Sequence, residues 1–250
     1  MSAGPRIDSY QWSGGREAML RFGPESGPMV VAALPLLEEA NRTRAFVVTI
    51  LRLLAEEGIG GVLPDLPGTG ESLVPTERMR LPDLRAAFAA AAHAAGEGVF
   101  GVAVRSGALL DADADLLGRW CLSPQSGKEL LREWRRVAGR ALDAELVEIG
   151  GNLLSYPLVE DFAGIHPREG RGPGSAHSEG STPSPIPSQL APGPRRLGTT
   201  RVVRFSSDPR DADLKVDGSP LWRRGEPEND FPLAQALAAD IARWIATCGG

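Results

Sequence analysis

The stretch "VFGVAVRSGALL", residues 99–110, decides the fold that this sequence predicts. Its first six residues are apolar and are typical of a strand buried on both faces. Arg105-Ser106-Gly107 then turns the chain, and the residues that follow favour a helix running to about Gly118. The stretch therefore predicts a strand, a tight polar turn and a helix in direct succession.

Predicted strands alternate with predicted helices on both sides of this unit. Short apolar runs indicate the strands, and apolar residues at helical spacing indicate the helices. Strands that alternate with helices of this length favour βαβ units, so we predict an α/β fold with a mainly parallel sheet flanked by helices. The predicted strands are 17–23, 28–35, 59–66, 99–104, 119–124 and 200–208, and the other predicted helices are 41–58, 81–98, 127–145 and 232–246.

Length and composition describe an ordinary globular chain. It has 250 residues, of which 42% are hydrophobic and 24% charged, and its formal net charge is −5. This balance gives no electrostatic reason to expect a nucleic-acid partner, and no apolar run approaches the roughly 20 residues that span a bilayer. The two cysteines, Cys121 and Cys248, suit neither a zinc site nor a disulfide framework. With no secretory leader at the N-terminus, we predict a cytoplasmic protein without metal or cofactor.

One segment interrupts the alternation of strands and helices. Residues 166–198 are dense in Gly, Pro and Ser and carry few large apolar side chains, so they cannot bury enough surface to offset their ordering entropy. We predict a disordered loop or a lid there. The strand and helix that follow need the earlier sheet to cover them, so residues 1–165 and 199–250 are expected to form one domain with this segment as an insertion.

Several motifs give the chain a resemblance to a known family. The two most informative are "PLLEEANRTR" (35–44) and "PDLPGTGES" (64–72). With them the sequence resembles the exosortase A system-associated hydrolases of the second type, a branch of the α/β-hydrolase superfamily linked to PEP-CTERM sorting. The resemblance implies an α/β-hydrolase-like fold and a link with exopolysaccharide production and protein sorting at the cell envelope. Further matching segments are 103–110, 121–136, 147–155 and 219–227.

The resemblance places an arginine at the position of the nucleophile. In this superfamily a serine stands in the pattern G-x-S-x-G, and the matching residues here read Ala103-Val104-Arg105-Ser106-Gly107. Members of this branch are similar in often carrying arginine there. A guanidinium has no lone pair to offer as a nucleophile. Ser106 has a hydroxyl but stands one residue later in the turn, and the alternative is that it is only a small residue that permits the turn.

The same resemblance places acidic residues at the other two triad positions. Asp208, after "VVRFSS", matches the position of the acid, although it is alternatively a simple turn residue. "EPENDFPLAQALAADI" (226–241) matches the region of the base, with Asn229 or Asp230 in place of the histidine. An aspartate beside another anionic acid cannot be a base near neutral pH unless its pKa is strongly shifted. The positional equivalents of the triad are therefore Arg105, Asp208 and Asp230.

The loop after the second predicted strand is the remaining candidate for ligand binding. It carries Glu38, Glu39, Asn41 and Arg44 where ordinary members of the superfamily have a His-Gly segment that contributes an oxyanion-hole amide. Together with Arg105 these residues are the predicted ligand-binding set. The alternative is helix capping, with Asn41 as the N-cap and the two acids beside the positive end of the helix dipole.

Three functional hypotheses follow from these positions. The first is a hydrolase-like protein with a degenerate triad, in which Arg105 joins an ion-pair network or binds an anion, and the cleft holds a small anionic or acyl ligand or a protein partner. The second is an active ester or thioester hydrolase with Ser106 as nucleophile and His166 or His177 as base, which requires one of these histidines within about 3 Å of the hydroxyl. The third is a non-catalytic scaffold whose own side chains fill the cleft.

Overall fold

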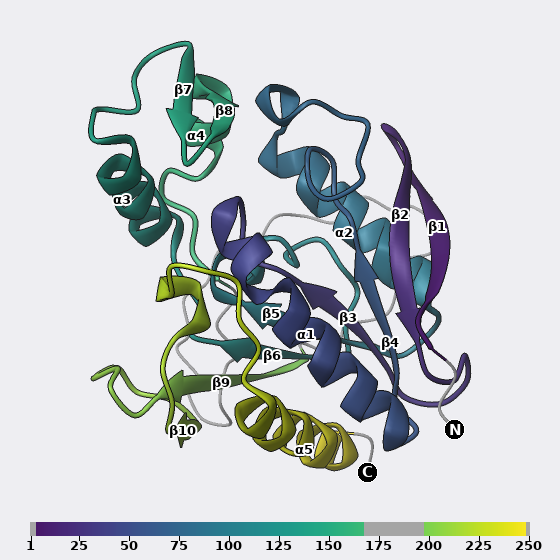
Figure 1. The fold of residues 1–250 in the computed structure, drawn as a ribbon. Helices are drawn as coiled ribbons and strands as arrows, with labels where there is room; N and C mark the ends of the chain where they lie inside the picture. The colour runs from purple at the N-terminus through teal and green to yellow at the C-terminus, as the bar shows by residue number, and fades with distance from the viewer. Residues whose placement is uncertain (1–3, 168–197, 249–250) are drawn as a thin grey trace, which may run out of the picture.

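The computed structural model describes residues 4–167 and 198–248, and an eight-stranded sheet forms the centre of this part of the chain (Figure 1). The strand order is β1-β2-β4-β3-β5-β6-β9-β10. The strands are β1 (Arg6–Trp12), β2 (Gly15–Phe22), β3 (Met29–Ala33), β4 (Gly60–Pro64), β5 (Val99–Val104), β6 (Gly118–Leu122), β9 (Thr199–Phe205) and β10 (Leu214–Val216).

The sheet is mainly parallel, as the sequence predicted. From β4 to β10 all neighbouring strands run parallel, whereas the β1–β2 hairpin is antiparallel and β2 also pairs with β4 in the antiparallel sense. The sequence did not predict β1, because only Tyr10 of this edge strand is buried and no alternation of apolar residues marks it. The carboxyl ends of the parallel strands meet along one edge of the sheet, which is where ligands bind in open α/β folds.

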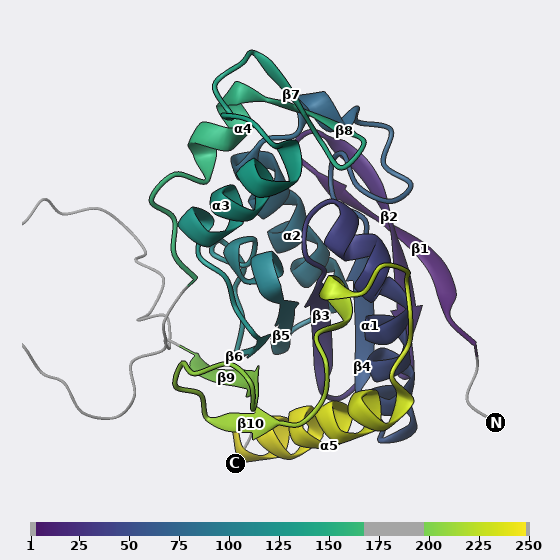
Figure 2. The same cartoon turned by 60° about the vertical axis from the view of Figure 1, so that its left-hand side comes forward.

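Helices cover both faces of the sheet, and the strands supply each layer with alternate side chains. Val30 of β3 packs in the layer formed with α1 (Glu38–Glu56) and α5 (Phe231–Cys248), and its neighbour Val31 packs in the layer formed with α2 (Leu81–Ala95). Figures 1 and 2 show α1 and α5 side by side on one face. All three helices were predicted, with ends shifted by a few residues.

The prediction of a helix after the polar turn is wrong. The chain forms only a 3-10 turn, η2 (Arg105–Leu109), and an irregular segment then leads to β6. Asp111, Asp113 and Asp115 occupy this segment, and aspartate side chains compete for backbone hydrogen bonds and favour turns over helix. Asp111 is buried, with Oδ2 3.2 Å from Nε of Arg119, so an ion pair fixes the segment against β6.

A small group of elements stands over the carboxyl ends of the parallel strands (Figure 2). It consists of α3 (Gly127–Ala138), the hairpin of β7 (Leu146–Ile149) and β8 (Asn152–Ser155), and α4 (Tyr156–Asp161). The helix α3 was predicted but is shorter than expected. It ends where Gly139 adopts the left-handed conformation, with φ of 64°, which stops a helix.

Most of the predicted insertion, residues 168–197 with His177, lies outside the described residues. After it, β9 pairs with β6 in the central sheet and α5 packs against α1, so residues before and after the insertion share one core. No helix in the described part of the chain is both long and apolar enough to cross a membrane.

Candidate functional site

Arg105 stands in a strained turn at the carboxyl end of β5. Its φ is 54°, a left-handed conformation that few non-glycine residues adopt. The turn brings η2 close to the neighbouring strand: a Cβ atom added at Gly107 would lie 2.5 Å from the carbonyl oxygen of Ala33. The sharp turn at the end of a strand is that of a nucleophile turn with an arginine at its apex, but the 3-10 turn η2 follows it in place of an α-helix.

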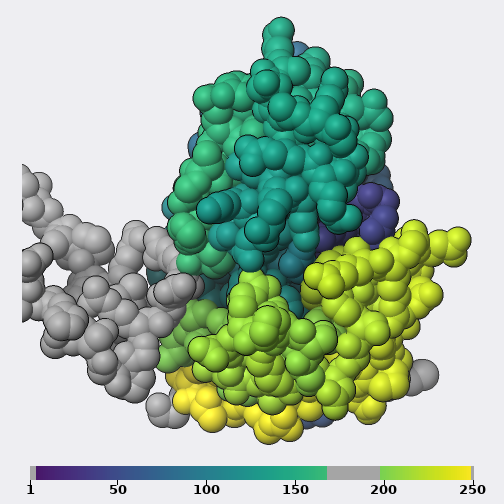
Figure 3. All heavy atoms as spheres, turned by 90° about the vertical axis from the view of Figure 1, so that its left-hand side faces the viewer, coloured from purple at the N-terminus to yellow at the C-terminus, as the bar shows by residue number. Residues whose placement is uncertain are grey.

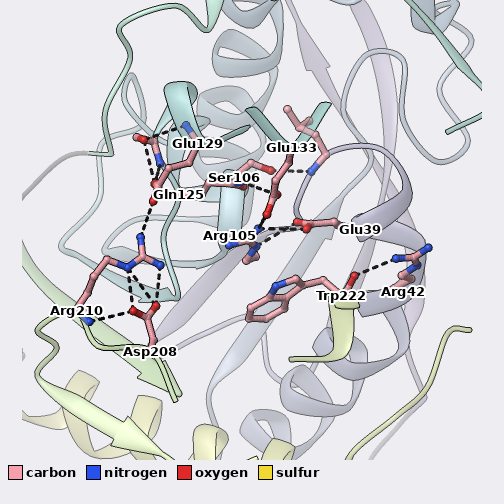
Figure 4. A network of polar contacts seen from close by, with 12 residues as sticks. Glu39, Arg42, Arg105, Ser106, Gln125, Glu129, Glu133, Asp208, Arg210 and Trp222 are labelled. Atoms are coloured by element: carbon pink, nitrogen blue, oxygen red, sulfur yellow. Dashed lines mark hydrogen bonds and ion pairs between the residues drawn. The ribbon is translucent and has the colours of Figure 1, made fainter. Parts of the chain in front are cut away.

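Two glutamates from two different helices hold the Arg105 guanidinium (Figure 4). Its Nε and Nη2 each donate to the Glu39 carboxylate of α1 at 3.3 Å, and Nη2 lies 2.7 and 2.9 Å from the oxygens of Glu133 on α3. The guanidinium carbon also lies 5.0 Å from the ring centroid of Trp222, and Gln125 Nε2 donates to Glu133 at 2.7 Å. We call Arg105, Glu39, Glu133 and Trp222 the Arg105 cluster.

The Arg105 cluster is largely withdrawn from solvent. Arg105 is 6% exposed, and the Glu39 and Glu133 side chains are 21% and 31% exposed. Burial raises the pKa of Glu39 above its usual range, since it outweighs the opposing effect of Arg105, and the charge of Glu133 adds to the rise. The guanidinium is therefore already engaged by two carboxylates, and it has no lone pair with which to attack a substrate.

Ser106 is turned into the protein. It is completely buried, and its Oγ accepts a hydrogen bond of 3.0 Å from the backbone N–H of Leu36 in the loop between β3 and α1. In α/β-hydrolases an N–H of this loop completes the oxyanion hole. Here the Leu36 N–H points at the serine hydroxyl instead, and the preceding Pro35 has no N–H to offer.

Asp208 lies after β9, but its partners are arginines. Its carboxylate lies 2.7 Å from Arg210 Nη2 and 3.2 Å from Arg204 Nη1, and Arg210 also reaches Glu129 of α3 at 2.8 Å. The hydrogen bond from Arg210 holds the pKa of Asp208 well below its usual range. We call these four residues the Asp208 cluster; it joins the loop after β9 to the start of α3.

Asp230 is placed at the start of α5. Its Oδ1 accepts a hydrogen bond of 3.1 Å from the backbone N–H of Leu233, so its side chain caps the helix, and Arg224 lies 3.7 Å away. The neighbouring Asn229 donates to Thr49 of α1 at 2.8 Å. Asp208 and Asp230 thus pair with other residues, and the carboxylate partners of Arg105 are Glu39 and Glu133.

The predicted ligand-binding loop divides between two places. Glu39 joins the Arg105 cluster and Glu38 pairs with Arg42 at 2.6 Å, whereas Arg44 pairs with Asp65 at 3.0 Å on the other side. Asn41 is exposed and does not cap α1, because the helix begins three residues earlier with Leu37 as its N-cap residue and no side-chain cap.

His166, one of the two histidines of the alternative mechanism, is the first residue of the predicted insertion, and its side chain is exposed. Among the described residues, the hydrogen bond to the Ser106 side chain comes from Leu36 and not from a histidine. Because His177 is not described, the hydrolase hypothesis stays a prediction.

A cavity of about 650 Å³ opens beside the Arg105 cluster. It lies between α1, α3, the β7–β8 hairpin and η3 (Leu221–Arg223), and Figure 3 shows the surface hollowed between the teal residues of α3 and the yellow segment that follows β10. A second cavity of about 310 Å³ lies on the other side of the β3–α1 loop, against Asn41 and Arg44. The larger cavity is lined by Leu36, Leu37, Glu38, Glu39, Arg42, Leu130, Arg132, Glu133, Trp134, Arg136, Val137, Ile149, Gly150, Trp222 and Arg223.

Sequence reasoning missed Glu133, Trp222 and Gln125 as site residues. Glu133 belongs to a helix rich in charged residues and has the pattern of a solvated helix face. The strand-turn pattern around Arg105 indicates a buried cation, and a buried cation requires carboxylate partners. Which carboxylates become these partners depends on how α1 and α3 pass over the end of β5.

Comparison with known proteins supports the fold. No protein-family model matches the sequence, and no curated protein does. Est1E from Butyrivibrio proteoclasticus superposes with a TM-score of 0.62 at 11% identity, over 98% of this chain and 100% of that one. A "Putative hydrolase" from Agrobacterium vitis S4 gives 0.58 at 12% identity, over 97% and 98%. Est1E with bound ferulic acid gives 0.50 at 16% identity, over 64% and 71%.

These likenesses, with the strand order and the strained turn after β5, show that the chain has an α/β-hydrolase fold. At identities this low they show the fold alone. Function has to be argued from the residues of the site.

Proposed function

We propose that this protein is a hydrolase-like protein without serine-hydrolase activity, and that it binds a ligand in the cavity beside the Arg105 cluster. One observation carries the proposal: the residue at the apex of the nucleophile turn is an arginine held by Glu39 and Glu133. The guanidinium has no lone pair with which to attack a substrate, and its two carboxylate partners are engaged in ion pairs with it.

The position of Ser106 supports the same conclusion. A serine nucleophile has to present its oxygen to the substrate with a base within hydrogen-bond reach. The Ser106 hydroxyl is fully buried, and it accepts a hydrogen bond from the very loop that would otherwise stabilise an oxyanion. For Ser106 to react, the turn and the β3–α1 loop would both have to change conformation.

Labelling with a fluorophosphonate probe tests the proposal. We expect the intact mass of the purified protein to stay unchanged under conditions that label a control serine hydrolase completely. An adduct that peptide mapping assigns to Ser106, and that Ser106→Ala abolishes, would overturn the proposal. It would favour the ester or thioester hydrolase with His166 or His177 as its base.

The ligand class that we propose is small and anionic or acyl, because the cavity combines arginines with apolar side chains. A protein partner and a scaffold role are the alternatives. A scaffold is the result expected if no ligand of this class binds.

The biological setting rests on the sequence resemblance alone. The resemblance to exosortase-associated hydrolases places the protein, as a proposal, in exopolysaccharide production or protein sorting, acting from the cytoplasm. An exosortase gene beside the gene for this chain would support that setting, and genomes that carry this gene and no exosortase would contradict it.

A further inference from the structure

Three arginines line the large cavity, and one of them, Arg132, also interacts electrostatically with Glu129 of the Asp208 cluster. Arg132 and Arg136 stand one helical turn apart on α3, and Arg223 belongs to η3. All three are exposed, and none of them forms an ion pair with another residue in the part of the chain that the structure describes. Two elements that are distant in sequence therefore direct cations to one cavity.

The other charges of the cavity wall are engaged within the protein. Arg42 pairs with Glu38 and donates to the backbone carbonyl of Trp222 at 3.1 Å, so it braces η3 against α1. Glu39 and Glu133 are held by Arg105. With Arg105 included, the cavity has two more arginines than carboxylates, on a chain whose formal net charge is −5. This local excess of positive charge favours an anion.

The rest of the wall is apolar. Leu37, Leu130 and Ile149 line it, and so does Val137, which is 49% exposed. Leu130 and Ile149 are already buried, so the apolar surface that a ligand can remove from water comes from the exposed Val137 and the half-buried Leu37. The cavity thus has an apolar part and a cationic part, and its volume of about 650 Å³ lies in the range of small-molecule sites.

We infer that the cavity takes a single-chain amphiphile with a phosphate headgroup. Arg132, Arg136 and Arg223 bind the headgroup, since the guanidinium fork matches phosphate oxygens, and the chain packs along Val137 and Leu37. This inference rests on the proposed function and names its ligand.

Titration with decyl phosphate below its critical micelle concentration tests the inference, with binding followed by calorimetry and by tryptophan fluorescence, because Trp134 and Trp222 line the cavity. We expect saturable binding that weakens as ionic strength rises. Inorganic phosphate tests the headgroup alone and decyl maltoside tests the chain with a neutral headgroup. Both are expected to bind at least about tenfold more weakly than decyl phosphate, since each makes only part of the contacts.

A triple variant locates the headgroup. Replacing Arg132, Arg136 and Arg223 by alanine is expected to weaken binding of decyl phosphate by about 30-fold, as charge-assisted hydrogen bonds are lost. Arg135→Ala is the matched control, because Arg135 is exposed on the same helix but does not line the cavity. We expect the control to change the Kd by less than about twofold.

The outcomes separate the inference from the proposed function. No binding of decyl phosphate, or binding that the triple variant leaves unchanged, overturns the inference. Inorganic phosphate that binds as tightly as decyl phosphate also overturns it, because the site would then be one for free phosphate. None of these results affects the absence of a Ser106 adduct, which tests the other part of the proposed function, the lack of serine-hydrolase activity.

Discussion

Arg105 combines an unfavourable backbone with favourable side-chain contacts. A non-glycine residue with a φ of 54° costs on the order of 1 kcal/mol. The ion pairs with Glu39 and Glu133 and the contact with Trp222 offset this cost. A single residue thus keeps the shape of the nucleophile turn while occupying the place of the nucleophile.

Removing the Arg105 charge should destabilise the protein strongly. Arg105→Met leaves Glu39 and Glu133 close together and partly buried without a cation, and we expect the free energy of unfolding to fall by about 3 kcal/mol. Urea unfolding followed by circular dichroism measures it.

Glu39→Gln is the matched comparison for that substitution. It keeps Arg105 paired with Glu133 and removes a carboxylate whose pKa burial raises, so we expect a loss of about 1 kcal/mol or less. If Arg105→Met and Glu39→Gln lower the free energy of unfolding equally, the view that Arg105 neutralises both carboxylates is contradicted.

Gly107 allows η2 to approach β3. In Gly107→Ala the new Cβ would meet the backbone carbonyl oxygens of Ala33 and Leu34 at 2.5 and 2.8 Å, and backbone atoms cannot move aside cheaply. We expect a loss of about 2 kcal/mol or more in unfolding free energy. Gly225→Ala is the control, since nothing lies within 4 Å of its added Cβ; a similar loss there would show that the effect is not steric.

At the scale of elements, local sequence pattern predicted the helices that pack on the sheet. In α1 the residues Phe46, Ile50 and Leu54 recur at helical spacing, and all three are buried as that spacing predicts. The β7–β8 hairpin and β10 were not predicted. These strands have only four, four and three residues, too few to show a period.

The Asp208 cluster should make the contact between the β9 loop and α3 sensitive to acid. The pKa of Asp208 is lower in the folded protein than in the unfolded chain, so its contribution is present above about pH 4 and is lost as the pH falls toward the folded value. We expect Asp208→Asn to lower the free energy of unfolding by about 2 kcal/mol at pH 7.

Thermal unfolding at several pH values checks this prediction. The difference between the wild type and Asp208→Asn should shrink below about pH 4, where Asp208 of the unfolded chain begins to be protonated while that of the folded protein is still charged. Asp113→Asn, a change at an exposed aspartate outside the Asp208 cluster, is the control variant. If the difference in stability between the wild type and Asp208→Asn stays constant down to pH 3, the lowered pKa of Asp208 in the folded protein is contradicted.

For the whole molecule, α5 is tied to the middle of the sheet by a buried carboxylate. Asp240 is 3% exposed and accepts hydrogen bonds from Trp120 Nε1 of β6 at 2.9 Å and from Arg201 of β9 at 2.8 and 2.9 Å. Burial by itself would raise the pKa of Asp240, but these donors hold it below the usual value. Segments on either side of the insertion are joined through this group.

Asp240→Ala should therefore weaken the entire fold. We expect a loss of about 3 kcal/mol, because the Arg201 charge and the Trp120 N–H lose their partner, with a single unfolding transition in which fluorescence and circular dichroism coincide. Two separate transitions would show that the C-terminal part unfolds independently of the rest.

The sequence by itself determined six strands of the central sheet, the helices α1, α2, α3 and α5, the mainly parallel sheet and the arginine at the turn after β5, because these follow from local periodicity and from short motifs. Only the tertiary structure decided which carboxylates surround Arg105. Glu39 and Glu133 are 94 positions apart in the chain, and they meet at one guanidinium because α1 and α3 both pass over the end of β5. Contacts of this kind depend on how elements pack, and no local pattern records them.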